Sequence, residues 1–417
     1  MTRPSWPRPD AEVVAVLATL DTKGEEIEYL LGLLAARGLR GWVIDTGVLG
    51  EPSASAAVSR AQVAAAAGAD LGTLRAGRDP ATALDAMAEG ARRVLRDLHT
   101  HGHLRAVVGV AGGKGAALFA TASADLPLTS LKILVASARA EVLARIASTS
   151  TTVVLPTLVD LMGLNQLTRQ ALHRAAVLAG SGDPVSTSPV APRTVAVTSF
   201  GVTTTAAMAC VAALRKRGAE TLVFPANGAG GRLLERLVDE GRIDGLIDLT
   251  TTELADELLG GAASAGPDRL RAAGRAGIPH WIAPGAVDMV NFGAPNTVPE
   301  RFGDRIFYRH SPYTTLMRTS AEENRRIGET VAERLNAGHG PRRVCWTGGG
   351  FSDYDRPGGP FHDPAADLGW LRGVQSGLDP DIELVTLDEH INAPAVAAGA
   401  VEWMVSALAA ATPGGPA

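Results

Sequence analysis

Short apolar runs alternate with amphipathic helical stretches along almost the whole chain. The run at 13–18 is followed by apolar residues at helical spacing, Ile27, Leu30 and Leu34. The same alternation recurs along the rest of the chain. Strands that are separated by helices pair in parallel, and right-handed crossovers then cover both faces of the sheet. The pattern therefore predicts an α/β protein built from doubly wound parallel sheets.

The expected strands are short and apolar, and a polar or glycine-rich loop follows most of them. In the first half we expect strands at 13–18, 42–44, 105–110, 133–135 and 153–155. In the second half we expect them at 194–198, 221–224, 245–249, 280–283, 305–308, 344–346 and 383–386. The clearest helices are expected at 81–98, 206–217, 233–240, 321–335 and 393–408.

A stretch rich in proline and serine interrupts this alternation near the middle of the chain. Residues 181–192 hold three prolines and three serines and lack any periodic apolar pattern, which is typical of a linker. We therefore expect two Rossmann-like domains, residues 1–183 and 193–417, joined by a linker at 184–192. A ligand cleft is expected between the two domains.

Composition excludes several classes of function. Lys and Arg total 39 against 44 Asp and Glu, a net charge of −5 without a basic block for nucleic acid or anionic lipid. The two cysteines, Cys210 and Cys345, lack CxxC spacing, which argues against a disulfide framework and a thiolate zinc site. No apolar run approaches the roughly 20 residues that span a bilayer, and the N-terminus lacks the apolar region of a signal peptide. We expect a soluble, cytoplasmic protein that binds neither nucleic acid nor membranes.

Doubly wound sheets bind ligands beyond the carboxyl ends of their strands, so the loops there hold the candidate residues. Gly112, Gly113 and Lys114 follow one strand and open a helix, where backbone N–H groups can approach a phosphate. A tight turn between strand and helix explains the same glycines equally well.

The loop after the first strand occupies the equivalent position. It contains Asp21 and Lys23, which we list as candidate ligand contacts. In the same loop Thr22 and Glu25 match a capping box, so a purely structural role is the alternative.

A glycine loop in the second half has the same form. Gly228, Gly230 and Gly231 follow the strand at 221–224, and Arg232 stands in the helical turn after them. We expect a second phosphate-binding loop here and place the decisive chemistry in the C-terminal domain.

Three consecutive threonines follow the strand at 245–249. Hydroxyl groups of Thr250, Thr251 and Thr252 at the start of a helix suit phosphate or sugar oxygens. Glu253 comes next and is either a catalytic carboxylate or, together with Thr250, part of a capping box.

Two arginines are candidates for binding an anion. Arg269 lies in a long glycine-rich loop that we expect to be flexible, and Arg318 lies in a polar loop after a predicted strand. A guanidinium group can donate two parallel hydrogen bonds to a phosphate or carboxylate. The alternative for Arg318 is an exposed ion pair with Glu322 or Glu323 on the next helix.

Histidines gather at the predicted strand ends of the second domain. His310, His362 and His390 lie there, with Asp288 and Asp388 in loops of the same kind. Histidine and aspartate together can act as acid and base, and we take His310, His390 and Asp288 as catalytic candidates. No HExxH spacing is present, so no metal ligand is assigned.

Two further patterns are typical of helix starts and need no ligand. Ser320 and Glu323 form a capping box. Asp363 directly precedes Pro364, the arrangement of an N-cap residue with proline in the first turn.

Several longer strings occur in a fixed order. They are Ala-Thr-Leu-Asp-Thr-Lys-Gly-Glu-Glu (18–26), Gly-Leu-Asn (163–165), Val-Phe-Pro-Ala-Asn-Gly-Ala-Gly-Gly-Arg (223–232), Asp-Leu-Thr-Thr-Thr-Glu-Leu-Ala-Asp-Glu (248–257), Ser-Ala-Gly-Pro-Asp-Arg-Leu (264–270), Asp-Met-Val-Asn-Phe-Gly (288–293), Thr-Leu-Met-Arg-Thr (315–319) and His-Ile-Asn (390–392). With these strings the chain resembles, over essentially its whole length, the Tm-one-like ATP-binding domain family. The resemblance implies two Rossmann-like subdomains, a homodimer and binding of an adenine nucleotide.

The chain departs from that family mainly in its first half. It has Gly-Gly-Lys-Gly-Ala-Ala (112–117) where the family usually has Gly-Gly-Ser-x-Gly-Thr, and Ala-Ser-Ala-Arg-Ala-Glu (136–141) in place of a stretch that ends in Gly-Asp. Pro225 replaces a common histidine and Ser311 a common asparagine. The N-terminal pocket therefore differs in its polar groups, while the C-terminal strings are largely kept.

Three hypotheses of function follow. In the first, ATP binds between the domains, with Mg²⁺ bridging its phosphates, and the protein activates or phosphorylates a small metabolite. In the second, the chain is a hydrolase or lyase that uses its histidines and aspartates without a nucleotide. In the third, it is a dimeric ligand sensor without catalysis.

Overall fold

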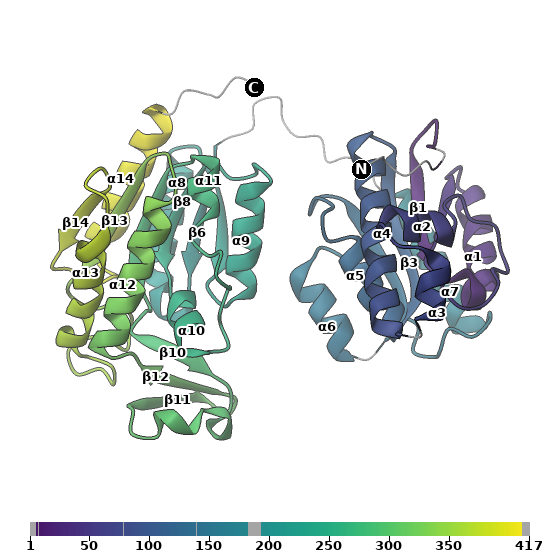
Figure 1. The fold of residues 1–417 in the computed structure, drawn as a ribbon. Coiled ribbons are helices and arrows are strands. Elements are labelled where there is room, and N and C mark those ends of the chain that lie inside the picture. Colours follow the sequence, from purple (N-terminus) through teal and green to yellow (C-terminus); the bar gives the residue numbers. More distant parts are fainter. Residues whose placement is uncertain (1–5, 7, 78, 139, 182–192, 411–417) are drawn as a thin grey trace. The chain divides into compact units, whose positions relative to one another are not determined.

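The computed structural model describes residues 6, 8–77, 79–138, 140–181 and 193–410. The chain divides into two compact units, Met1–Ser186 and Thr187–Ala417, each built around its own parallel sheet (Figure 1). The predicted linker at 184–192 lies outside the described residues. No helix that the structure describes is long and apolar enough to cross a membrane.

The described part of the first unit alternates strands and helices as the sequence predicts. Its elements are β1 Val13–Ala18, α1 Leu20–Ala35, β2 Gly41–Asp45, α2 Arg60–Ala66, α3 Leu71–Ala76, α4 Pro80–Thr100, β3 Leu104–Gly112, α5 Gly113–Ala122, β4 Leu131–Ser137, α6 Ala140–Thr149, β5 Val153–Pro156 and α7 Gln166–Gly180.

The second unit continues this alternation and adds a smaller sheet. Its main elements are β6 Thr194–Ser199, α8 Thr204–Lys216, β7 Glu220–Pro225, α9 Ala229–Asp239, β8 Gly245–Thr250, α10 Glu253–Leu259, α11 Ala272–Ala276, β9 His280–Gly285, β10 Met289–Phe292, β11 Phe307–Ser311, β12 Thr314–Arg318, α12 Ala321–Asn336, β13 Arg342–Thr347, α13 Pro364–Gly377, β14 Glu383–Leu387 and α14 Pro394–Ala410.

Strand order reverses once in each parallel sheet. The first sheet has the order β2-β1-β3-β4-β5, so the chain leaves β1 toward one edge and returns on the other side of it as β3. The second sheet has the order β14-β13-β9-β8-β6-β7, with the same reversal between β6 and β8. Ligands of doubly wound sheets bind where the strand order reverses, so a ligand site is expected at these two places.

Alternating side chains of each strand supply two separate apolar layers. In β1, Val13, Ala15 and Leu17 pack in one layer with α4 and α5, whereas the alternate residues pack in the other layer with α1 and α7. Successive side chains of a strand point to opposite faces, so a fully buried strand must be apolar throughout. The structure thus confirms the predicted α/β class with two Rossmann-like domains.

A three-stranded antiparallel sheet, β10-β12-β11, was not predicted (Figure 1). The sequence suggested a parallel strand at 305–308 and a loop through Arg318, but β11 pairs antiparallel with β12 and Arg318 is the last residue of β12. Only Pro312 and Tyr313 separate these two strands. A parallel connection needs a crossover of a dozen or more residues, so this short turn permits only antiparallel pairing.

Two of the four predicted helix caps are wrong. Ser320 with Glu323 forms a capping box and Asp363 caps α13, as predicted. However, α1 begins at Leu20, ahead of Thr22, and α10 begins at Glu253, behind Thr252. Thr250 is the last residue of β8 and therefore cannot be the N-cap of the following helix.

Candidate functional site

A cavity of about 340 Å³ opens in the first unit where its strand order reverses. Its walls come from the ends of β1 and β3 and from the first turns of α1 and α5. Four of the predicted contact residues line it: Lys23, Gly112, Gly113 and Lys114. Sequence reasoning thus brought together residues 90 positions apart because both loops follow neighbouring strands of one sheet.

This cavity is rich in unsatisfied positive charge. The Lys23 ammonium donates one hydrogen bond to the Leu161 carbonyl, at 2.5 Å, and has two further N–H groups. Lys114 is exposed, and within the described residues it has neither a hydrogen bond nor an ion pair. Gly112 precedes α5 without a side-chain cap, so the amino end of this helix is open to an anion.

Lysine is rare in this chain, yet both Lys23 and Lys114 line the same cavity. The sequence contains four lysines among its 39 basic residues, and two of the four line this one cavity. Lysine presents a compact charge that binds phosphate well. The other basic residues of the chain are almost all arginines.

A second cavity, of about 480 Å³, adjoins the first and is mainly apolar. The two cavities share six lining residues: Thr19, Thr22, Thr46, Lys114, Gly115 and Leu118. The apolar wall of the second cavity comes from α3, α4, α5 and the loop after β2, through Val48, Leu49, Leu74, Pro80, Ala83, Leu84, Met87 and Leu118. A charged compartment thus lies directly beside an apolar one.

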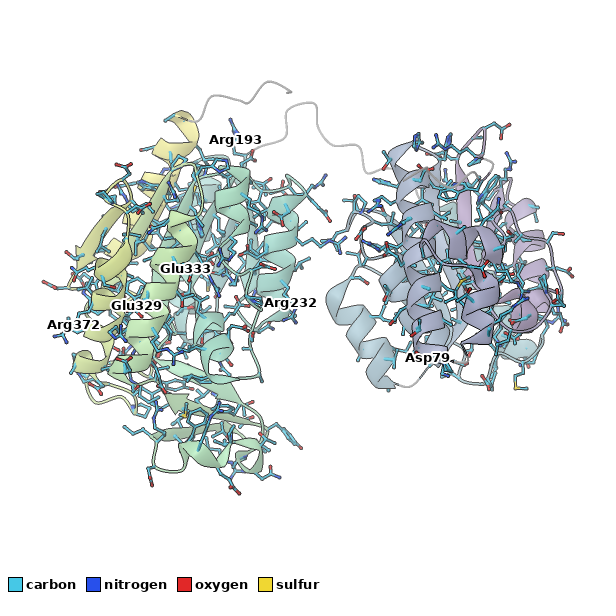
Figure 2. All side chains as sticks on the ribbon, in the orientation of Figure 1. Asp79, Arg193, Arg232, Glu329, Glu333 and Arg372 are labelled. Atoms are coloured by element: carbon cyan, nitrogen blue, oxygen red, sulfur yellow. The ribbon has the colours of Figure 1, made fainter. Side chains whose placement is uncertain are left out.

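The polar side chains of the larger cavity are mostly engaged by their own chain. Asp21 accepts a hydrogen bond from the Gly50 N–H at 3.0 Å, and Asp79 accepts one from the Ala81 N–H at 3.0 Å. Arg75 donates its Nε hydrogen to the Val48 carbonyl at 2.5 Å. Figure 2 shows Asp79 at the end of the first unit where α4 begins.

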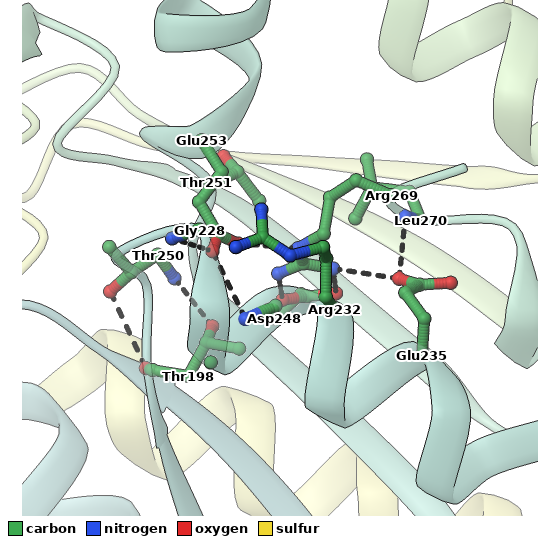
Figure 3. Close-up of polar contacts among 12 residues, drawn as sticks. Thr198, Gly228, Arg232, Glu235, Asp248, Thr250, Thr251, Glu253, Arg269 and Leu270 are labelled. Carbon is green, nitrogen blue, oxygen red and sulfur yellow. Dashed lines mark hydrogen bonds and ion pairs between the residues drawn. The ribbon is translucent and has the colours of Figure 1, made fainter. Parts of the chain in front are cut away.

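The predicted phosphate loop of the second unit already holds an anion from its own chain (Figure 3). The N–H groups of Gly228 and Gly231 donate to Oε1 of Glu253 at 2.7 and 3.1 Å. A Cβ on Gly231 would lie 2.3 Å from Oε2 of the same carboxylate. The glycines therefore make room for Glu253, which is 1% exposed and occupies the place expected for a phosphate.

Arg269 connects this carboxylate to two others. Its Nε donates to Oε2 of Glu253 at 2.6 Å, and its terminal nitrogens donate to Asp248 at 2.8 Å and Glu235 at 3.1 Å. The loop that we expected to be flexible thus buries Arg269 to 1% exposure (Figure 3). Burial raises the pKa of Asp248, but the charge and hydrogen bonds of Arg269, together with those of His280, outweigh burial and hold that pKa well below its usual range.

The remaining candidates of this region also have structural partners. Arg232 is exposed and donates to the Ser264 carbonyl at 2.7 Å. Gly230 donates its N–H to Oδ1 of Asn227 at 3.1 Å. Their role as ligand contacts stays a prediction.

The three threonines are fully buried, and each hydroxyl is already bonded. Thr250 meets the Thr203 hydroxyl at 2.7 Å, Thr251 donates to the Ala283 carbonyl at 2.9 Å, and Thr252 donates to the Met289 carbonyl at 3.4 Å. They connect neighbouring loops to one another.

Arg318 does not form the exposed ion pair considered above. Glu322 pairs with Arg325, and Glu323 pairs with Arg305. Arg318 is 3% exposed and donates to Asp367 at 2.5 Å and to the Phe361 carbonyl at 2.7 Å. It therefore fastens the small antiparallel sheet to α13, and its role in ligand binding stays a prediction.

Asp288 belongs to the same buried cluster. Ser352 donates to its Oδ2 at 2.7 Å, whereas Oδ1 is buried and has no partner among the described residues. Burial, together with the neighbouring charge of Asp355, raises the pKa of Asp288 to about 7. Burial raises the pKa of Asp367 to about 9, because the charge of Arg318 does not offset it.

Each of the three predicted histidines contacts a different residue of the loop 352–355, and His362 has its Nδ1 3.7 Å from Oδ1 of Asp355. Both ring nitrogens of His390 face the backbone: Nδ1 accepts from the Asn392 N–H at 3.1 Å, and Nε2 lies 2.9 Å from the Ser352 carbonyl. His310 lies on β11 with Nδ1 2.9 Å from the Tyr354 hydroxyl. No group of three or more His, Cys, Asp or Glu side chains in the described ranges is arranged to hold a metal.

Sequence reasoning missed Asp355 and Asp367 and the apolar cavity. Asp367 had a recognisable signal, because it shares helical spacing with Trp370 and Val374, both buried. An acid on an apolar helix face needs a buried partner, and Arg318 supplies it. The apolar cavity had no signal of this kind, since its residues also resemble an ordinary core.

Glu253→Gln tests the ionic role of the Glu253 carboxylate. The change keeps the side-chain shape but removes the charge beside Arg269, so the free energy of unfolding should fall by about 1.5–3 kcal/mol. Urea denaturation measures this loss. Glu329→Gln is the matched control, because Glu329 pairs with Arg325 at an exposed position where a loss of about 0.2–1 kcal/mol is expected (Figure 2). Equal losses in the two variants would contradict the ionic role.

Asp288 and Asp367 should make the second unit less stable as the pH rises. Both have an ordinary pKa of 3.8, so the unfolded chain releases their protons near pH 4 while the folded unit keeps them up to about pH 7 and 9. The folded state binds more protons in this window. Its free energy of unfolding should therefore fall with rising pH, on the order of 1 kcal/mol per pH unit for each proton held.

The check is urea denaturation at several pH values between 4 and 9. Asp367→Asn removes one titrating group, so the free energy of unfolding should fall less steeply with rising pH. Asp381→Asn, at an exposed position, should leave this pH dependence unchanged. An unchanged fall in Asp367→Asn would refute the assignment.

Comparisons with known proteins agree with this two-part architecture. Residues 12–182 match the model of the N-terminal domain of the uncharacterised protein family UPF0261, and residues 192–408 match that of its C-terminal domain. A UPF0261 protein of Rhizobium meliloti is 37% identical over 396 residues, covering 93% of this chain and 97% of that protein. A second, from Mesorhizobium japonicum, is 36% identical and covers 91% of this chain and 96% of its own length.

A plant protein also matches. The ToMV resistance protein Tm-1 of Solanum lycopersicum is 34% identical over 319 residues, which cover 74% of this chain and 42% of that protein. This match confirms the resemblance inferred from the sequence strings. The chain belongs to the UPF0261 family.

Proposed function

We propose that this chain binds a nucleotide, with ATP as the first candidate, and that its N-terminal unit carries the site. The observation behind the proposal is the charged cavity where the first sheet reverses its strand order. Lys23, Lys114 and the open amino end of α5 supply the positive charge that a phosphate chain needs.

The adjoining apolar cavity supports a nucleotide over a simple phosphate. Ligand sites of about 300–1,000 Å³ that combine apolar walls with a few polar groups are typical of cofactors and substrates. Phosphates in the smaller cavity would leave the base and ribose to extend past the shared Lys114 into the larger one. The resemblance to an ATP-binding family points the same way.

Lys114 stands where the family usually has a serine, and this departure strengthens the proposal. A hydroxyl donates one hydrogen bond, whereas an ammonium adds a full charge and three donors. Mg²⁺ needs no dedicated cluster of carboxylates here, because it is commonly bound through one or two of them together with the phosphates and water.

The C-terminal unit is a weaker candidate for the nucleotide. The carboxylate of Glu253 fills its phosphate loop, and Arg269 and Arg318 already donate to acidic side chains of their own chain. The hydrolase hypothesis uses His310, His362 or His390. His310 lies 2.9 Å from the Tyr354 hydroxyl, His362 lies 3.7 Å from Asp355, and both ring nitrogens of His390 contact the backbone. We therefore propose neither as the primary function.

Lys114→Met should weaken binding of ATP by about tenfold or more, because a charge-assisted contact of about 1.5–3 kcal/mol is lost. Isothermal titration calorimetry with Mg·ATP, and separately with inorganic triphosphate, measures the effect, and both ligands should lose affinity. Lys216→Met, in the last turn of α8, is the matched control and should bind as the parent does. Unchanged affinity in Lys114→Met, or no binding by the parent, would refute the proposal.

A further inference from the structure

The segment between β5 and α7, residues 157–165, is attached to the helix that lines the charged cavity. Lys23 in the first turns of α1 donates to the Leu161 carbonyl at 2.5 Å. One turn later, Glu26 accepts the Gly163 N–H at 2.9 Å, and this glutamate is 1% exposed. The same helix face therefore holds the segment at two points.

Both ends of the segment are fixed as well, and Asp160 in its middle accepts a hydrogen bond from the Ser137 hydroxyl at 2.9 Å. The Thr157 N–H donates to the Ala136 carbonyl at 3.1 Å, and Asn165 caps α7. Between these points Leu161 is fully buried, whereas Leu158 and Met162 are 84% and 80% exposed. When this segment is ordered, the exposed side chains of Leu158 and Met162 are therefore held in defined positions.

Lys23 contacts the segment and the cavity at once. Its ammonium has three N–H groups, of which the Leu161 carbonyl takes one, and the side chain lines the cavity that we assign to phosphate. A phosphate bound to the remaining N–H groups would hold the ammonium in place and with it the contact to Leu161.

We propose that Lys23 transmits occupancy of the nucleotide site to residues 157–165, which become more ordered when ligand binds. This inference rests on the proposed function and concerns regulation of the same site. Coupling between two places is reciprocal, so a segment held in its ordered form would in turn raise the affinity for the nucleotide.

The chain offers an internal control for this role. Lys114 lines the same cavity and is expected to contact the same phosphates, but it is exposed and, among the described residues, makes no hydrogen bond or ion pair with residues 157–165. Replacing Lys114 should weaken nucleotide binding and leave the contact between α1 and residues 157–165 intact. Replacing Lys23 should weaken binding and also remove its contact with that segment.

Hydrogen exchange of the full chain, read by mass spectrometry, tests this directly. In the parent, saturating Mg·ATP should slow exchange in peptides covering 157–165 by threefold or more. Lys114→Met should show the same slowing once enough ATP is added to saturate it, with saturation checked by calorimetry. Lys23→Met, also saturated, should show no slowing in this segment.

A second variant guards against a folding defect. Lys23→Gln keeps a donor for the Leu161 carbonyl but loses the charge, so the free protein should exchange as the parent does and the ATP-dependent slowing should be lost. Slowing of parental size in either saturated Lys23 variant would overturn the inference. Binding of ATP by the parent without slowing at 157–165 would overturn the inference alone, whereas no binding of ATP would overturn the proposed function as well.

Discussion

The reversal of strand order between β1 and β3 is the constraint on which the proposed site depends. The connection after β1 lies on one face of the sheet and the connection after β3 on the other, so no helix fills the space above their carboxyl ends. The cavity at this place is lined by the loops that the reversal separates. Positive charge at the cavity comes from the first turns of the two helices that begin there, through Lys23 in α1 and Lys114 in α5.

The second unit has the same reversal but closes the region around it with its own side chains. Glu253 occupies the glycine loop after β7, and Arg269 joins it to Asp248 at the end of β8. A buried charge network of this kind is costly unless every member is paired, which explains why glycines, acids and arginine occur together here. In the described structure, strings that predicted a phosphate site thus form an internal ion cluster.

Much of the fold could be predicted from the sequence, because alternating apolar periods determine which segments pair. The small sheet was missed since β10, β11 and β12 are short and their pairing depends on turn length more than on composition. In the site, the loops after strands led to Lys23 and Lys114, and the structure places both at one cavity. The same reasoning could not tell that Glu253 fills the second loop, because its partner Arg269 is 16 residues away and meets it only in the fold. Asp355 was missed for the same reason, because Arg318 meets it only in the fold.

Photochemical labelling with an azido derivative of ATP tests the central claim most directly. An azide on the base reacts with residues that line the base site, and digestion followed by mass spectrometry identifies the labelled peptide. Our account predicts label in peptides from 71–87 or 113–118, which line the larger cavity, and its loss when unmodified ATP competes. Competable label in peptides from 226–270 would place the nucleotide in the second unit and contradict the account.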